Sequence, residues 1–130
     1  MHTPLDLSDP PWPPAFDIQQ GCEPATPLVY ASPHSGRLYP QDLMAASMLD
    51  DAAIRKSEDV FVDTLIAGAH DVGVSLISAQ YGRAYIDVNR TAYELDQAMF
   101  EDDLPLFARA QSPRVSAGLG TIARLSLIHI

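Results

Sequence analysis

A histidine stands where an apolar run of the sequence gives way to a polar turn. His34 follows the apolar residues 28–31 and lies inside the sequence Ser-Pro-His-Ser-Gly-Arg at 32–37. The apolar residues predict a buried strand over 27–32, and proline and glycine are typical of the sharp turn that would end it. Because open α/β sheets bind ligands just beyond the carboxyl ends of their strands, we expect His34 to lie at a functional edge.

The chemistry open to His34 depends on its neighbours. A neutral imidazole there is able to ligate a metal ion or to shuttle a proton, and Ser32 and Ser35 are placed to hydrogen-bond its second nitrogen or a substrate oxygen. A capped turn with an exposed histidine is the alternative, and the pattern alone does not choose between them. A serine nucleophile is disfavoured, because Ser35 has Pro33 and Arg37 where a nucleophile elbow has glycines.

Two acidic residues, Glu58 and Asp59, follow Ser57 within a stretch that has apolar residues at helical spacing from residue 50 onward. The spacing predicts an amphipathic helix that is broken near Ser57, with Ser57 capping the second segment. Both acids would then lie in a first helical turn, where the macrodipole favours negative charge. The alternative is a functional role for one of them. Gly73 is expected to end the helix.

Two further β signals cover residues 74–79 and 83–89. The second runs into Asn89 and Arg90. A guanidinium group at a strand end is suited to hold a substrate carboxylate through two parallel hydrogen bonds. An internal ion pair between Arg90 and Asp87 is the alternative, and it stays open at this point.

Length and composition predict one small globular domain, with 130 residues and 47% hydrophobic content. A formal net charge of -9 argues against nucleic acid and anionic membranes as partners. The single cysteine excludes an internal disulfide, and no signal peptide or membrane-length apolar run is visible, so we expect a cytoplasmic setting. Residues 1–26 are expected to be a proline-rich lead-in, in which 16–26 is a connector.

Five short motifs follow one another in order between residues 27 and 124. They are Ser-Pro-His-Ser-Gly-Arg at 32–37, Ser-Glu-Asp at 57–59 with Val-Asp at 62–63, Arg-Ala-Tyr-Ile-Asp-Val-Asn-Arg at 83–90, Glu-Leu-Asp at 94–96, and Gly-Leu-Gly-Thr-Ile-Ala-Arg at 118–124. Together they resemble the N-formylglutamate amidohydrolases, also called N-formylglutamate deformylases. The resemblance implies an α/β fold, a mixed sheet with flanking helices similar to the zinc-dependent exopeptidases, for residues 27–124.

The same resemblance implies a reaction and roles for individual residues. The reaction is hydrolysis of N-formyl-L-glutamate to formate and L-glutamate, a late step of histidine breakdown, with a divalent metal, zinc, as cofactor. His34 would be a metal ligand and Asp59 the acidic ligand, with Glu58 as the alternative. Asn89 and Arg90 would hold the substrate carboxylate.

Arg37 and Ser35 are further candidates for binding this small N-acyl amino acid substrate, and neither nucleic acid nor membrane is expected as a partner. The family's second half supplies another histidine ligand and a general base, so no catalytic base is expected here. Residues 125–130 do not look like the family's continuation and are expected to be an unrelated tail. We therefore expect an incomplete fold, the inactive N-terminal part of an enzyme. A non-catalytic α/β domain or a fragment without a complete metal site is the alternative.

Overall fold

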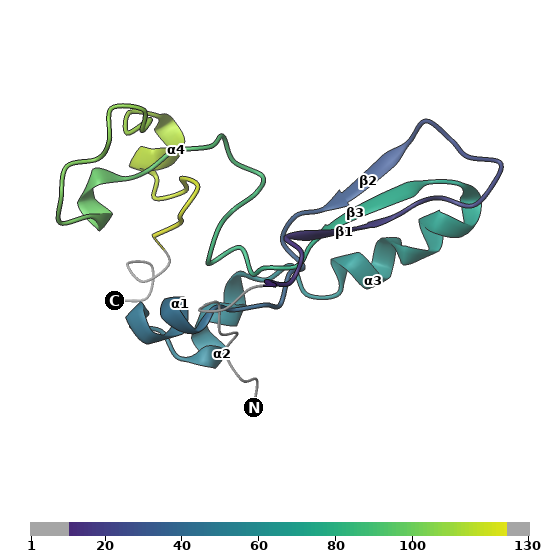
Figure 1. The fold of residues 1–130 in the computed structure, drawn as a ribbon, viewed down its shortest axis with the longest axis horizontal. Helices are drawn as coiled ribbons and strands as arrows, with labels where there is room; N and C mark the ends of the chain where they lie inside the picture. Colours follow the sequence, from purple (N-terminus) through teal and green to yellow (C-terminus); the bar gives the residue numbers. More distant parts are fainter. Residues whose placement is uncertain (1–10, 125–130) are drawn as a thin grey trace.

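The computed structural model describes residues 11–124; the first ten residues of the expected lead-in and the expected tail at 125–130 lie outside the described residues. Its sheet contains β1 (Phe16–Gln19), β2 (Val29–Ser32) and β3 (Ser75–Ala79) in the order β1-β3-β2. Strand β2 runs parallel to β3 and β1 runs antiparallel to it (Figure 1). The sheet is therefore mixed, as predicted, and β2 and β3 lie within the strands predicted over 27–32 and 74–79. The prediction that the first of these is buried is wrong, because three of the four residues of β2 are exposed.

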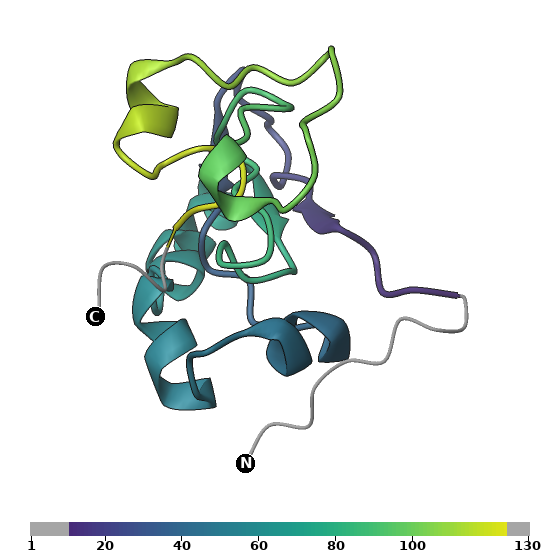
Figure 2. The same ribbon diagram turned by 90° about the vertical axis from the view of Figure 1, so that its left-hand side faces the viewer.

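The chain between β2 and β3 is helical, which gives the molecule its α/β character. It contains α1 (Gln41–Ala46), α2 (Asp51–Ile54), the 3-10 helix η1 (Arg55–Ser57), α3 (Val62–Ile66) and the 3-10 helix η2 (Ala67–Val72). After β3 come the 3-10 helix η3 (Gln97–Met99) and α4 (Pro113–Ser116). Helix α3 lies alongside the sheet, and in Figures 1 and 2 the α1–α2 segment lies at the bottom and α4 at the top. Within residues 11–124, no helix has both the length and the apolar character needed to cross a membrane.

A cluster of buried apolar residues lies beside the end of the sheet, on the loops that follow β2 and β3 and on α2. Tyr39, Ile54 and Ala84 are 3%, 2% and 6% exposed, and the partly buried residues packed against them are Leu43, Met44 and Leu49. By contrast, Ile18 in β1 and Val29 in β2 are more than half exposed. The core therefore anchors the loops that follow β2 and β3, which are the loops that carry the site.

These two loops stay in contact after their strands end. The amides of Arg37 and Leu38 both donate to the Gln80 carbonyl oxygen at 2.9 Å. A Cβ atom at Gly36 would collide with the carbonyl oxygen of Tyr81. Only glycine fits this approach, so Gly36 allows the loop after β2 to lie flat on the loop after β3.

The predicted strand over residues 83–89 is wrong, because the segment forms a series of turns. The Tyr85 amide donates to the Gly82 carbonyl at 2.9 Å, as in a turn. Ile86 and Val88 are 42% and 57% exposed, whereas Asp87 between them is 2% exposed. The alternation of this segment therefore places an acid inside and apolar residues outside.

The predicted cap at Ser57 is also wrong. Its hydroxyl donates back to the Ile54 carbonyl at 2.9 Å, and the next helix begins only at Val62. Glu58 and Asp59 lie in the linker between the two helices, outside any first turn. The Asp59 amide donates to the His34 carbonyl at 3.0 Å, which holds this linker against the loop after β2.

The expected connector over 16–26 contains strand β1, so that expectation is corrected as well. All four residues of β1 are exposed, which leaves no one-sided apolar pattern to signal a strand. The expected stop at Gly73 is confirmed: this residue follows η2 with a φ of 81°, in the left-handed region that glycine tolerates.

Candidate functional site

The His34 imidazole lies between two carboxylates from distant segments of the chain. Its Nε2 atom is 2.8 Å from Asp87 Oδ1, and its Nδ1 atom is 3.2 Å from Asp59 Oδ2. The side chains of His34 and Asp87 are buried, whereas that of Asp59 is 47% exposed. The ring therefore has one buried carboxylate contact and one that faces solvent.

The topology explains how these residues meet. His34 lies two residues beyond the end of β2, and the parallel strand β3 ends at the same edge and leads through turns to Asp87. Asp59 is brought in by the hydrogen bond from its amide to the His34 carbonyl. His34 and Asp59, the two residues that the family resemblance names as metal ligands, thus lie together at this edge, with Nδ1 and Oδ2 3.2 Å apart.

Asp87 is held in its ionised form. Burial alone would raise its pKa, but hydrogen bonds from His34 and from the Asn89 amide, with the nearby charge of Arg83, lower the pKa of Asp87 below its ordinary value. Arg83 Nη2 lies 2.8 Å from Asp87 Oδ2. An ionised carboxylate only accepts hydrogen bonds, so Nε2 of His34 bears the hydrogen that is donated to Asp87. The other ring nitrogen, Nδ1, faces Asp59.

Ser35, a candidate for substrate binding, is buried inside the loop and hydrogen-bonded within it. It is 4% exposed, and its hydroxyl is hydrogen-bonded to that of Ser32, which is 1% exposed. The same hydroxyl donates to the Asp59 carbonyl and accepts from the Asp63 amide, each at 3.3 Å. These contacts fix the turn that presents Asp59 to His34.

Glu58, the alternative acidic ligand, belongs to a different cluster. Its Oε1 atom accepts hydrogen bonds from the Tyr39 hydroxyl at 2.8 Å and from Arg55 Nη1 at 2.9 Å. The guanidinium of Arg55 also lies over the Tyr39 ring, 4.4 Å from its centroid. Burial, with the hydrogen bond to Glu58, raises the pKa of Tyr39, so the phenol stays protonated and keeps donating.

Arg90 is folded back onto the main chain. Its Nε atom donates to the Leu119 carbonyl at 3.1 Å and Nη1 donates to the Asn89 carbonyl at 3.0 Å. Its distance to Asp87 Oδ2 is 3.9 Å, so Arg83 is the nearer cation of that carboxylate. The sequence indicated Asp87 only as an alternative partner of Arg90, and it indicated no role for Arg83. The available signal was an acid in the middle of an apolar run.

The other two candidates for substrate binding are separated. Asn89 lines a cavity of about 300 Å³ at this edge of the sheet, together with Ser32 and Val88 among others. Arg37 pairs with Asp63 at 3.1 Å in a partly exposed ion pair. The cavity is therefore next to the loop that carries His34, whereas the guanidinium of Arg37 is engaged with α3.

The His34 pair fits part of a zinc site. Zinc binds imidazole nitrogen and carboxylate oxygen, and catalytic zinc sites commonly use three protein ligands. Nδ1 of His34 and a carboxylate oxygen of Asp59 face each other. In many metal sites the second nitrogen of a ligating histidine donates to a carboxylate that fixes the ring, and Asp87 occupies that position relative to His34. Among residues 11–124, no further His, Cys, Asp or Glu ligand atom completes a group of three with this pair.

Three comparisons with known proteins agree on one family. Residues 26–127 match the family of N-formylglutamate amidohydrolases. Over 84 residues the chain is 32% identical to N-formylglutamate deformylase of Pseudomonas putida, a stretch that covers 65% of this chain and 28% of that relative. The crystal structure of N-formylglutamate amidohydrolase from Ralstonia eutropha JMP134 has a TM-score of 0.73 and 34% identity, covering 84% of this chain and 38% of that one.

The chain thus spans less than half the length of both relatives, in the part that contains the His34 loop and its two carboxylates. The family match covers every described residue of this site, and the structural match extends over most of the chain. This chain belongs to the N-formylglutamate amidohydrolase family.

Proposed function

We propose that the chain supplies the metal-binding and carboxylate-binding part of an enzyme that hydrolyses N-formyl-L-glutamate to formate and L-glutamate. Membership of the family and the names of two relatives support the reaction. The observation that carries the site is the His34 imidazole held between Asp59 and the ionised Asp87.

In this proposal His34, through Nδ1, and Asp59 hold a divalent metal, zinc by ligand type. When bound, the metal would polarise the formyl oxygen and acidify a water molecule. Asp87 accepts a hydrogen bond from Nε2 of His34 and so fixes the ring, while Arg83 balances the charge of Asp87. Glu58 is assigned to the Tyr39 cluster and not to the metal.

Arg90, with Asn89 beside it, is proposed to bind the substrate carboxylate. Nε and Nη1 of Arg90 already donate to carbonyl oxygens, and Nη2 has no hydrogen-bond partner among residues 11–124. A carboxylate would therefore meet a guanidinium whose position is already fixed. Arg37 is the alternative, and it would first have to leave Asp63.

The remaining ligand and the general base are proposed to come from the part of the family's length that this chain does not span. The chain alone is then expected to show no measurable deformylation. An architecture like that of the zinc-dependent exopeptidases, a cytoplasmic setting and a place in histidine breakdown belong to the same proposal.

A chimera tests the proposal, with residues 26–124 of this chain replacing the matching part of the Ralstonia eutropha enzyme. Formate release from N-formyl-L-glutamate and bound zinc are measured together. His34→Ala and Asp59→Asn should each abolish formate release and lower the zinc content, whereas Glu58→Gln should retain zinc. A chimera that stays fully active after His34→Ala would exclude His34 as a ligand, and a chimera that folds without activity would favour a non-catalytic domain.

A further inference from the structure

A second group of potential metal ligands lies at the opposite end of the sheet from His34. Cys22 follows β1, and His70 and Asp71 precede β3. Because β1 is antiparallel to β3, the residues after β1 and those before β3 meet at one end of the sheet (Figure 1). His34 follows the carboxyl end of β2, so the two groups are separated by the length of the strands.

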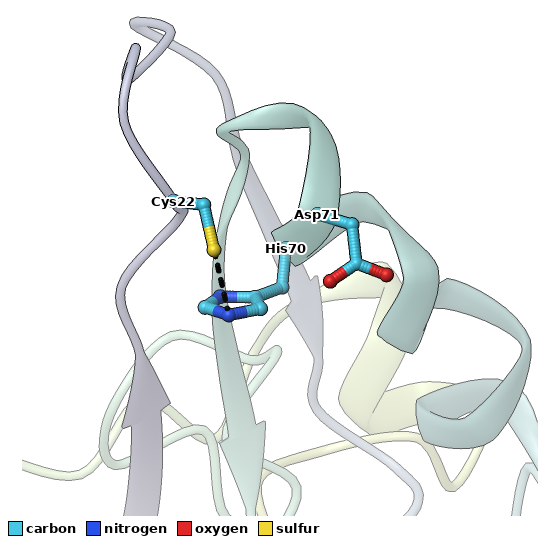
Figure 3. A group of neighbouring side chains, drawn as sticks. All are labelled: Cys22, His70 and Asp71. Atoms are coloured by element: carbon cyan, nitrogen blue, oxygen red, sulfur yellow. Dashed lines mark hydrogen bonds between the residues drawn. The ribbon is translucent and has the colours of Figure 1, made fainter.

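The three side chains converge from two segments that are far apart in sequence. The Sγ atom of Cys22 is 3.1 Å from Nε2 of His70 (Figure 3). One ligand atom from each of the three residues lies within 4.8 Å of the other two. Cys22 and Asp71 are exposed, so an ion from solvent can reach the group. Nδ1 of His70 is buried and has no hydrogen-bond partner among residues 11–124, which leaves one ring nitrogen unused.

The main chain holds this group together independently of its side chains. The Cys22 amide donates to the His70 carbonyl at 3.0 Å, and the Thr26 amide donates to the Gly73 carbonyl at 2.9 Å. Gly21 approaches Gly73 so closely that a Cβ atom at Gly21 would collide with the Gly73 main chain. The main-chain segments that carry the ligands are therefore already held together, so little main-chain ordering is needed when an ion binds.

We propose that Cys22, His70 and Asp71 form a second metal site, separate from the proposed amidohydrolase site, that takes a thiophilic divalent ion of the zinc class. Thiolate, imidazole and carboxylate are all zinc ligands, and a thiolate selects against magnesium and calcium. On binding, the S–H bond of Cys22 breaks, its proton passes to solvent, and the sulfur electron pair binds the ion. Three protein ligands leave one tetrahedral position for water. The ion ties the segment after β1 to the start of β3.

The test uses the full 130-residue chain, freed of metal, kept reduced and titrated with cobalt(II) and then zinc. Because Cys22 is the one cysteine in the sequence, a thiolate-to-cobalt charge-transfer band reports on this residue alone. We expect a saturable band at one equivalent that zinc removes. Cys22→Ser should abolish the band. His70→Gln and Asp71→Asn should each weaken binding at least about tenfold, since loss of even an outer partner costs about 10–100-fold.

Two outcomes of this titration overturn the proposal. One is the absence of a saturable band from the unsubstituted chain. The other is a band unchanged by both His70→Gln and Asp71→Asn, which would assign the ion to sulfur alone or to sulfurs of two copies.

Matched controls separate this site from the one around His34. Asp59→Asn removes a proposed ligand of the other site, and Asp17→Asn removes an exposed acid of β1; both variants should keep the cobalt band. Its loss in either would overturn the assignment. A second measurement needs no substitution: zinc should slow alkylation of Cys22 by iodoacetamide, whereas magnesium should not. Equal alkylation with and without zinc also overturns the proposal.

Discussion

Asp87 joins three parts of the chain through one buried carboxylate and its own amide. The carboxylate contacts His34 and Arg83, and the amide donates to the Thr121 carbonyl at 2.8 Å. Asp87→Asn keeps the shape but removes the charge, so Arg83 loses its nearest carboxylate and His34 loses its buried acceptor. We expect a loss of about 1.5–3 kcal/mol in the free energy of unfolding, the range for hydrogen bonds to a charged group. Urea denaturation measures it.

The control for Asp87→Asn is Asp63→Asn, which breaks the partly exposed pair with Arg37. An exposed pair contributes little, so this variant should lose less than about 1 kcal/mol. Equal losses in the two variants would mean that burial adds nothing to the Asp87 contacts.

The lowered pKa of Asp87 also predicts how stability depends on pH. In the unfolded chain the carboxyl titrates near its ordinary value of about 3.9, and in the folded chain it titrates lower. The contribution of Asp87 to the free energy of unfolding is therefore fully present above the pKa of the unfolded chain. It is lost as the pH falls through the pKa of the folded chain. The free energy of unfolding should decline below about pH 4 more steeply in the unsubstituted chain than in Asp87→Asn. Parallel curves would show that Asp87 is not the group responsible.

Arg90 provides the prediction on substrate specificity, tested in the chimera defined above. Arg90→Lys keeps the charge but loses the fork of donors, so kcat/KM for N-formyl-L-glutamate should fall by about ten- to a hundredfold. Arg90→Ala should lower kcat/KM further, because it removes charge-assisted hydrogen bonding on the order of 2–4 kcal/mol. The loss should fade for an N-formyl substrate without carboxylates. Equal losses on both substrates would assign Arg90 to the fold through its contacts with Leu119 and Asn89.

At the scale of elements, the two loops beyond β2 and β3 depend on the absence of a side chain at Gly36. In Gly36→Ala the new methyl group would meet the main chain of Tyr81, which cannot rotate away as a side chain can. We expect a loss of about 1–3 kcal/mol, the usual cost of overpacking. Gly68→Ala is the matched control, because a Cβ there meets nothing within 4 Å. It should be neutral or stabilise η2 by about 0.5–1 kcal/mol. Thermal denaturation of both variants compares them.

Strands β2 and β3 were accessible from the sequence because each is a short run rich in apolar residues that ends at a turn signal. The segment 83–89 has a similar composition, yet its conformation is set by contacts that no local pattern contains. Asp87 is drawn inward by His34 and Arg83, and this overrides the β preference of its neighbours. Strand β1 was missed for a related reason, since it depends on hydrogen bonds to β3 and buries none of its own residues.

The same limit applies to the candidate site. The meeting of His34 and Asp59 followed from the strand end and the family motif. The place of Glu58 in the Tyr39 cluster and the inward position of Ser35 depend on tertiary packing around the loop. A sequence motif shows which residue types occur together, but it does not show which of two neighbouring carboxylates faces the histidine.

For the whole molecule, the dominant electrostatic fact is the excess of 17 acidic over 8 basic residues. Repulsion among exposed carboxylates opposes the compact state, and salt screens it. The thermal midpoint should therefore rise as sodium chloride is increased from about 0.01 M to about 0.15 M, where the Debye length falls from about 30 Å to about 8 Å. Differential scanning calorimetry measures the thermal midpoint.

Neutralising an exposed acidic run with Glu101→Gln, Asp102→Asn and Asp103→Asn should raise the thermal midpoint at low salt and reduce its dependence on salt. A midpoint that falls with salt would show that attractive pairs dominate.

The central position of β3 also governs how the chain reaches this structure. Both partners of β3 come from the first quarter of the chain, whereas β3 itself begins at Ser75, after all the helices of the crossover. No neighbouring segment can complete the sheet, so a long intervening loop must be closed before any strand pairing compensates for the lost chain entropy. Although its helices are short and local, refolding should therefore take on the order of milliseconds or longer, rather than the microseconds of small helical bundles.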